Sequence, residues 1–556
     1  MQGIGIGESD FKMLRLNNNY FIDKSLYVKD IIDNKSKVIL VTRPRRFGKT
    51  LNMSMLRYYF DIKCKDSKEL FKGLKIMEQD EYYTSKLGAF PVIYLSLKDA
   101  GLMNYEYMIM QMKTIMMDMF YEHKYILENQ DLSEGEKAIF NRILKAEATD
   151  VDLINSLKIL SKMLYIYYNR PVILLVDEYD VPLQTAYVKG YYSETIDFLK
   201  SFYTTTFKDN PYLEKTVITG VSRIAKESIF SGMNNLKVYT IMDNEFADDF
   251  GITSEEMKKV ISDFDLKENE EEIKKWYDGY KIGNVEGIYN PWSILNYLAD
   301  RVLKPYWVNT SSNDLIKMTF KKSNIVKEKM IKLLNDEPVE VKIDLETIIV
   351  GIENKEENIW GLMLQTGYLK VVETVDLIRG IYKVVLPNNE IKFLFEDMVD
   401  NWFSNKVEGE DLRSILNDLV NLKLEDFERK LKKLVIEMFS YFDVGENTAE
   451  SFYHAFILGM LVGLKDSYYV KSNRESGHGR YDIMLEPKEK ESNSFIMEFK
   501  IVESMEEKEL KAKIKEAKEQ IRDKKYEQEL KERGFKNITK MVFVCNGKEI
   551  RMEVFK

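Results

Sequence analysis

The residues best suited to chemistry near the start of the chain are Gly48, Lys49 and Thr50, which follow the apolar run 38–41. An apolar strand that turns through glycine into a helix gathers free backbone N–H groups and the positive end of the helix dipole, an arrangement that binds phosphate. Lys49 is then placed for the β- and γ-phosphates of a nucleotide, and Thr50 for Mg²⁺. The predicted nucleotide contacts of this loop are Arg46, Phe47, Gly48, Lys49, Thr50 and Leu51.

The loop matches only the second half of the phosphate-loop pattern. The pattern G-x-x-x-x-G-K-[ST] requires glycine where this chain has Arg43, which Pro44 follows. Gly-Lys-Thr after an apolar run also occurs by chance in many chains. A second element is therefore needed to decide between a nucleotide site and an ordinary turn.

That second element is the continuous apolar run 172–176, which ends in Asp177 and Glu178. Such a run is typical of a strand buried in a parallel sheet. Asp177 at its carboxyl end is placed to hold Mg²⁺ near Thr50, and Glu178 to act as general base or to position water. The alternative is a core strand followed by a capping acid, but the accompanying phosphate loop favours the nucleotide site.

Two further strands are predicted around these motifs, over 90–97 and 215–221. The first lies between the phosphate loop and the acidic strand in the sequence, an order typical of NTPases with an added central strand and a catalytic glutamate. The second ends in Thr219, Ser222 and Arg223, where a polar side chain can sense the γ-phosphate. Arg223 is predicted to stabilise phosphoryl charge, in its own chain or a neighbour's; the alternative is a surface ion pair.

A second chemical pattern lies near the C-terminus, on predicted strands over 481–486 and 494–501. Side chains alternate across a strand, so Glu498 and Lys500 share a face, and Asp482 on the paired strand can join them. Two carboxylates and a carbonyl can hold Mg²⁺ or Mn²⁺, and the lysine can orient an attacking water. This is the chemistry of phosphodiester hydrolysis. Nearby basic side chains suit phosphate contacts or simply a solvated loop; they are Lys471, Arg474, His478 and Arg480.

Several stretches together carry a family resemblance. They are Arg43-Pro-Arg-Arg-Phe-Gly-Lys-Thr50, Asp177-Glu-Tyr-Asp180, Thr219-Gly-Val-Ser-Arg223 and Ser231-Gly-Met-Asn-Asn235. Over nearly its whole length the chain resembles the bacterial and archaeal AAA-ATPase-like proteins that carry a C-terminal PD-(D/E)XK nuclease-like domain. In that family the loop also departs from the strict glycine pattern.

The resemblance implies further roles for individual residues. The Gly-His-Gly-Arg-Tyr-Asp stretch at 477–482 and Gln520 on the helix that follows resemble the PD-(D/E)XK domain. By that resemblance Asp482, Glu498 and Lys500 are catalytic, Glu475 is an additional metal ligand and Gln520 supports the site. The segment before the loop lies near the nucleotide in the family, so Asp23 and Lys24 are candidates too, although a solvated helix start explains them equally well.

Composition narrows the class of protein. The 556 residues exceed one ordinary core, and a net charge of −9 argues against a broad nucleic-acid surface while leaving room for a local DNA groove. Two distant cysteines and three scattered histidines exclude a disulfide framework and a zinc centre, so any metal must sit on carboxylates. With no leader pattern and no membrane-length apolar run, we expect a cytoplasmic protein that does not enter a membrane.

The expected fold class is α/β in three parts. A P-loop NTPase domain with a three-layer, mostly parallel sheet is predicted over 1–240, its Met-rich stretch 100–168 forming packed core helices. A helical lid and winged-helix-like connecting region follows over 241–440, with a hairpin at 367–387 and a helix from Asn389. A small α/β PD-(D/E)XK nuclease-like domain closes the chain over 441–556.

These patterns predict an enzyme that binds and hydrolyses ATP with Mg²⁺ and whose nucleotide state controls a Mg²⁺-dependent nuclease module acting on DNA. One alternative is a nucleotide-binding regulatory or scaffold protein whose C-terminal domain does not cleave. Another is a DNA-binding regulator that works through residues 310–440. The sequence leaves open the oligomeric state, the nuclease substrate and the pathway.

Overall fold

The computed structural model divides into two compact units, residues 1–322 with 340–391 and residues 323–339 with 392–556. Each unit is described by itself. The described residues are 3–64, 67–223, 230, 233, 235–307, 324–334, 336–345, 355–404, 412–439, 453, 457, 460–464, 467–472, 475–476, 479–480, 482–502, 505–523, 527–546 and 549–555. The domain boundaries expected at 240 and 440 stay predictions.

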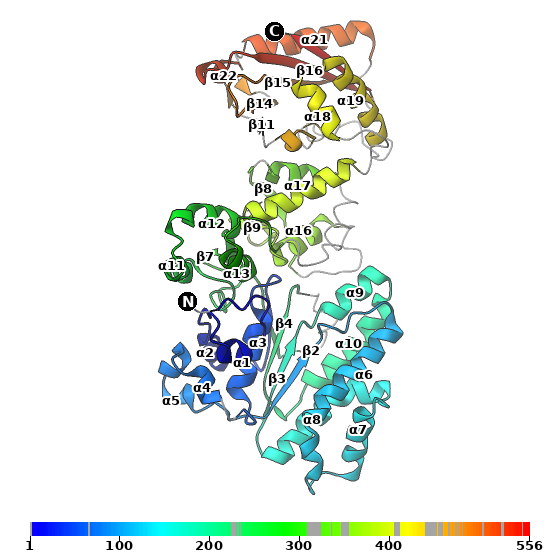
Figure 1. Cartoon of the computed structure of the whole chain (residues 1–556). Helices are drawn as coiled ribbons and strands as arrows, with labels where there is room; N and C mark the ends of the chain where they lie inside the picture. The colour runs from blue at the N-terminus through cyan, green and yellow to red at the C-terminus, as the bar shows by residue number, and fades with distance from the viewer. Residues whose placement is uncertain are drawn as a thin grey trace. The chain divides into compact units, whose positions relative to one another are not determined.

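The first unit is built on a five-stranded sheet whose order is β2-β3-β4-β1-β5, with every neighbouring pair parallel (Figure 1). Its strands are β1 (Val38–Thr42), β2 (Val92–Ser96), β3 (Val172–Asp177), β4 (Leu213–Gly220) and β5 (Leu236–Tyr239). The prediction of a mostly parallel α/β sheet is therefore confirmed. The strand that separates β1 from β3 in space is β4, whereas β2, which lies between them in the sequence, is at the sheet edge.

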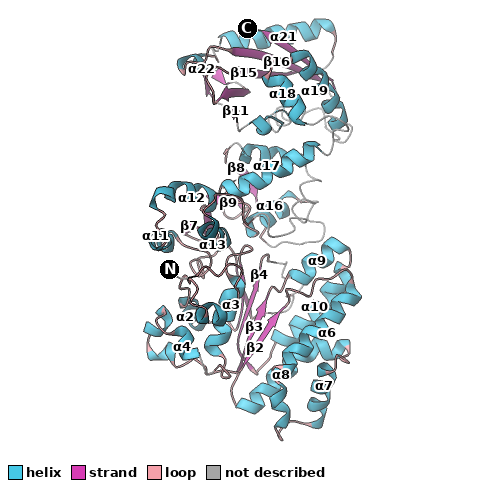
Figure 2. Ribbon diagram, viewed as in Figure 1, coloured by secondary structure: helices cyan, strands magenta, loops and turns pink. Residues whose placement is uncertain are grey.

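Helices cover both faces of this sheet, as in Figure 2. Strands β1 and β3 are buried along their whole length, which explains why their sequences are continuously apolar. The helices of this part are α1 (Phe11–Leu16), α2 (Leu26–Asp33), α3 (Lys49–Phe60), α4 (Ser67–Phe71), α5 (Glu81–Thr84), α6 (Tyr105–Tyr121), α7 (Glu134–Leu144), α8 (Asp150–Tyr168), α9 (Val181–Lys189) and α10 (Tyr192–Phe207).

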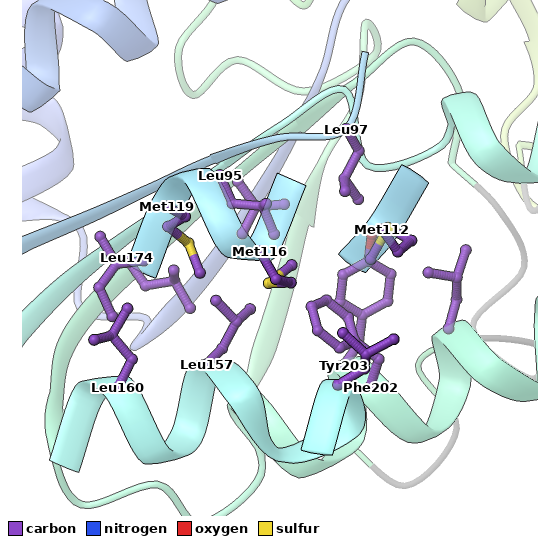
Figure 3. Close-up of a cluster of buried hydrophobic side chains, with 14 of the residues drawn as sticks. Leu95, Leu97, Met112, Met116, Met119, Leu157, Leu160, Leu174, Phe202 and Tyr203 are labelled. Carbon is purple, nitrogen blue, oxygen red and sulfur yellow. The ribbon is translucent and has the colours of Figure 1, made fainter. Parts of the chain in front are cut away.

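The Met-rich stretch forms helices that pack into the core. Met112, Met116 and Met119 from α6 lie among leucines of β2, β3 and α8 (Figure 3). Unbranched methionine fills irregular gaps between helices and a sheet. The prediction that this stretch is core is confirmed, with Met103 and Met110, 70% and 61% exposed, as exceptions.

Beyond β5 the alternation of strand and helix stops. The elements here are α11 (Ser254–Asp263), α12 (Glu270–Tyr277), β6 (Tyr280–Ile282), β7 (Val285–Ile288), α13 (Pro291–Asp300), β8 (Val339–Lys342), α16 (Glu356–Gln365), β9 (Lys370–Asp376), β10 (Ile381–Val385) and α17 (Asn389–Ser404). Strands β9 and β10 pair antiparallel, with β8 on the other side of β10. The predicted hairpin and the helix starting at Asn389 are both present.

The second unit contains a mixed sheet of order β11-β14-β15-β16-β17, in which only the β15–β16 pair is parallel. Its elements include α15 (Asn324–Leu334), α18 (Leu412–Val420), α19 (Leu424–Phe439), β11 (Tyr468–Ser472), β12 (Glu475–Ser476), β13 (Gly479–Arg480), β14 (Ile483–Pro487), β15 (Ser494–Ile501), α21 (Glu507–Asp523), α22 (Gln528–Glu532), β16 (Ile538–Asn546) and β17 (Glu549–Phe555). Such a sheet fits a small α/β nuclease-like domain. Across the described ranges, none of the helices has the length and apolar character needed to span a membrane.

Candidate functional sites

The phosphate loop runs from the end of β1 to the start of α3. Gly48 immediately precedes α3 with a φ of 85°, and Arg46 has a φ of 67°. The left-handed region costs glycine little but costs arginine strain, and such strain concentrates at functional sites. The loop therefore turns the chain sharply at the N-terminus of a helix, which is the geometry that binds an anion.

Lys49 and Thr50 connect this loop to the acids that follow β3. The Lys49 ammonium is buried and donates to the carbonyls of Arg43 at 2.9 Å and Pro44 at 2.8 Å. Burial lowers the pKa of Lys49 to about 8, against the attraction of Glu178 and neighbouring acids. The Thr50 side chain and the Lys49 charge both lower the pKa of Asp177. The two segments predicted to share a nucleotide thus meet.

Asp177 lies at the end of β3, where burial raises the pKa of its carboxyl although hydrogen bonds from Thr219 and Thr50 oppose the rise. The Thr219 hydroxyl donates to Asp177 Oδ1 at 2.5 Å. A carboxylate beside a threonine hydroxyl is a pair of oxygen ligands suited to Mg²⁺. These residues fit the predicted ion, which would supply charge neutralisation for the phosphates.

Glu178 follows Asp177 with a φ of 54°, a strained conformation for a residue other than glycine. Burial, followed by repulsion from Asp177, raises the pKa of the Glu178 carboxyl, and Lys49 opposes the rise. A raised pKa brings a carboxylate closer to the range in which it exchanges protons near neutrality. The position and chemistry of Glu178 suit a general base.

Arg43, which replaces the usual glycine, points into the protein and away from solvent. It is fully buried and its guanidinium donates to the carbonyls of Thr240 at 2.9 Å, Glu245 at 3.1 Å and Phe246 at 2.8 Å. Burial lowers its pKa to about 10. The substitution therefore anchors the base of the loop to the turn after β5.

A polar network beyond the predicted residues links the loop to the end of β4. Asp180 Oδ2 accepts from the Ser222 N–H at 3.0 Å, from the Ser222 hydroxyl at 3.1 Å and from Gln184 Nε2 at 2.7 Å. Gln184 Oε1 in turn accepts from Arg45 at 3.1 Å. Sequence reasoning missed Arg45 and Gln184 as site residues. The spacing of Asp180 and Gln184, one helical turn apart, was the available signal.

Gly220 is predicted to be essential to this network. A Cβ there would lie 2.5 Å from a Tyr179 ring carbon and 2.7 Å from Asp180 Oδ1. We expect Gly220→Ala to lower the free energy of unfolding by about 1–3 kcal/mol through overpacking. Gly135→Ala, on a helix with open space around it, is the control and should leave stability unchanged or raise it by about 0.5–1 kcal/mol. Chemical denaturation measures both; equal effects would contradict the prediction.

The remaining predicted residues of this part have structural contacts. Ser222 is turned toward Asp180, as described, while the Arg223 N–H donates to Gln365 Oε1 at 2.5 Å. Asp23 accepts from the backbone N–H groups of Ser25 and Lys75, both at 2.9 Å. Lys24 forms an ion pair with Glu256 at 2.6 Å. Nucleotide contact by any of these side chains stays a prediction.

The second predicted site assembles at the start of β14 and on β15 and α21. Asp482 Oδ2 accepts from the Phe499 N–H at 2.8 Å, and Lys500 Nζ donates to Glu498 Oε1 at 3.1 Å. Gln520 accepts from Lys500 at 2.8 Å and also donates to Glu498 Oε1. Glu498 is buried, with only 1% of its side chain exposed. The structure therefore brings together the side chains predicted from alternation and from the resemblance.

A metal ion at this second site would rest on few carboxylates. In the described part of the chain no three His, Cys, Asp or Glu side chains gather where they could hold a metal. Asp482 and Glu498 offer oxygen ligands suited to Mg²⁺ or Mn²⁺. The Glu475 side chain, like Arg474 and His478, lies outside the described residues, although the Glu475 backbone pairs with Arg480.

Lys471 forms an ion pair in the structure, and its predicted phosphate contact stays a prediction. Its ammonium lies 2.5 Å from Glu486 Oε2, and Arg533 binds the same carboxylate at 2.9 Å. Glu486 is 7% exposed, so two cations neutralise one buried acid. This ion-pair network joins β11, β14 and the end of α22.

The sheet order, the loop after β1 and the acids after β3 define a P-loop-like α/β domain. Residues 4–230 match the family model described as predicted AAA-ATPase, and residues 448–555 match that of the PD-(D/E)XK nuclease superfamily. The chain therefore carries a region similar to AAA-ATPases over residues 4–230 and a region similar to PD-(D/E)XK nucleases over residues 448–555.

A relative of this chain occurs in Azotobacter chroococcum mcd 1. It is named "Uncharacterized protein in vnfD 5'region" and is 24% identical over 396 residues, covering 70% of this chain and 68% of the relative. The match extends well beyond the length of either domain model. The name states no activity.

Proposed function

We propose that the protein binds and hydrolyses ATP with Mg²⁺ at the loop between β1 and α3, and that nucleotide state controls a Mg²⁺-dependent nuclease module acting on DNA. The observation that carries the proposal is the meeting of the two nucleotide motifs. Thr50 and Lys49 from the phosphate loop both lower the pKa of Asp177, the acid at the end of β3, against the effect of burial. Lys49, Thr50 and Asp177 would bind the phosphates and the ion, and Glu178 would accept a proton from water.

The proposal of control is supported by hydrogen bonds of Trp307 to the loop and to Glu390. Trp307 Nε1 donates to the Arg45 carbonyl at 3.1 Å, and the Trp307 N–H donates to Glu390 Oε1 at 2.6 Å. Glu390 lies in the first turn of α17, and the chain enters the second unit at Lys392. A change in the loop on nucleotide binding would therefore act on the start of this helix.

Lys49→Ala tests the proposed nucleotide site. We expect the Kd for ATP with Mg²⁺ to rise about 10- to 100-fold, because a hydrogen bond to a charged group is lost. Isothermal titration calorimetry on the full chain measures the affinity. Lys72→Ala is the control, since Lys72 is largely exposed and lies near Glu69. Wild-type protein that takes up neither ATP nor ADP would refute the nucleotide site.

A further inference from the structure

The outer side of the phosphate loop is held by residues that lie after the ATPase family match. The match ends at residue 230. The Trp307 indole N–H reaches the Arg45 carbonyl, and the Gly251 N–H donates to the Phe47 carbonyl at 3.2 Å. The peptide groups that carry the Arg45 and Phe47 carbonyls thus each accept a hydrogen bond from a later part of the same unit.

These two contacts set the direction of two loop amides. A planar trans peptide points its C=O and its N–H in opposite directions, and the described part of the chain has no cis peptide. Because the Arg45 carbonyl faces Trp307, the Arg46 N–H faces the opposite side of the loop. The Phe47 carbonyl sets the Gly48 N–H in the same way. Within the described ranges neither N–H donates a hydrogen bond, and successive amides of this kind bind phosphate oxygens.

Trp307 is itself held rigidly. Its backbone N–H binds Glu390 Oε1, and the Ser293 hydroxyl donates to Glu390 Oε2 at 2.8 Å. Its ring lies 5.2 Å from that of Tyr368. Trp307 is 2% exposed and Glu390 is fully buried. A side chain fixed at both its backbone and its ring can orient the peptide group to which it donates.

Side-chain contacts of the loop support the same conclusion. The Phe47 ring lies 4.9 Å from the Tyr280 ring, and the Arg46 guanidinium lies 4.2 Å from the Trp292 ring centre. Residues 45–47 thus each contact the part of the unit after β5.

We infer that Trp307, fixed by Glu390, is a positioning residue of the nucleotide site. It orients the phosphate loop so that the Arg46 and Gly48 amides face the phosphates. The inference rests on the proposed function, because it concerns the same site. It adds that the region after residue 240 is part of that site, and that the loop does not take its binding geometry from the family domain alone.

Trp307→Phe in the full chain removes the indole donor and keeps a ring against Tyr368. We expect the Kd for ATP with Mg²⁺ to rise about fivefold, since one hydrogen bond that preorganises the loop is lost. Intrinsic fluorescence gives a second measurement, because Trp307 should change its emission when nucleotide binds and that signal should vanish in the variant. Calorimetry and fluorescence titration together check both expectations.

Trp276→Phe is the matched control. Trp276 lies on α12, half-buried against a separate cluster, so its replacement should leave both the affinity and the nucleotide-dependent signal unchanged. If Trp307→Phe fails to fold, a second pair of variants decides. Glu390→Gln keeps an acceptor for the Trp307 N–H and should bind ATP as wild type does, whereas Glu390→Leu should bind more weakly.

Unchanged affinity in folded Trp307→Phe, or a nucleotide-dependent emission change that persists in it, would overturn the inference and leave the proposed function intact. Equal affinities for Glu390→Gln and Glu390→Leu would do the same. Wild-type protein that binds no nucleotide would instead overturn the proposed function and this inference with it.

Discussion

Replacing Glu178 with glutamine is expected to slow ATP hydrolysis by about 10²- to 10⁴-fold while leaving the Kd for ATP within about threefold of the wild-type value. Glutamine has the size of glutamate but cannot accept a proton from the attacking water. The predicted phosphate and ion contacts come from Lys49, Thr50 and Asp177, which the substitution leaves in place. A change confined to kcat would identify Glu178 as a group that acts in the chemical step.

The pH dependence of hydrolysis gives the same assignment a second test. Burial and the nearby Asp177 raise the Glu178 pKa above its ordinary value of 4.5. The active form of a general base is the deprotonated one, so kcat should fall on acidification, with its midpoint above pH 4.5. Phosphate-release kinetics across pH measure this fall of kcat on acidification. The fall should be missing from the residual activity of Glu178→Gln.

The control for this experiment is Glu194→Gln in the first turn of α10, which should hydrolyse ATP at the wild-type rate. Wild-type kcat in Glu178→Gln would show that another group activates the water. Loss of ATP binding in that variant would show a role in the nucleotide complex itself.

The elements that the sequence predicted well depend on local patterns. Continuous apolar runs gave β1 and β3, alternation gave the shared face of Glu498 and Lys500, and turn residues gave the β9–β10 hairpin. Each pattern is local in the sequence and reflects the burial or the turn of neighbouring residues. The order of the strands in the sheet could not be predicted from such patterns. Nothing in residues 90–97 shows that their strand lies at the edge of the sheet while β4 lies at its centre.

Contacts between distant segments could not be predicted in the same way. The interior orientation of Arg43 depends on carbonyls about two hundred residues later in the chain, in the turn after β5. The Trp307 donor to Arg45 joins residues 262 positions apart. An indole or a guanidinium that binds a backbone carbonyl leaves no pattern in its partner's sequence, because every residue has a carbonyl. Such contacts require the fold itself.

Lys471 shows a related limit. This residue was predicted to contact phosphate or to lie in a solvated loop, and the sequence did not indicate its ion pair with the buried Glu486 on the adjacent strand. The pairing neutralises a carboxylate that the core would otherwise hold at a large desolvation cost. The sequence therefore shows that a residue is positively charged but does not show which negatively charged group it binds.

The largest effect in the second unit is expected from Asp482→Asn and Lys500→Ala, each of which should reduce metal-dependent DNA cleavage by about 10²-fold or more. Asparagine keeps an acceptor for the Phe499 N–H but removes a negative ligand for the metal. Alanine removes the ammonium that contacts Glu498 and Gln520, the group predicted to orient water and stabilise phosphate charge. Cleavage is measured on supercoiled and linear DNA with Mg²⁺ or Mn²⁺, with and without ATP, and EDTA should abolish it.

Lys515→Ala is the matched control for this site, because Lys515 lies on the exposed side of α21 and pairs with Glu519 on the same helix. It should cleave as wild type does, and a thermal melt of each variant separates loss of chemistry from loss of folding, since Lys500→Ala leaves the buried Glu498 without its cation. Full cleavage by folded Asp482→Asn and Lys500→Ala would reject the assigned site. Wild-type protein that binds ATP and cleaves no DNA with either metal would favour the alternative in which the C-terminal domain binds a partner without cutting, because the described residues gather only two carboxylates there.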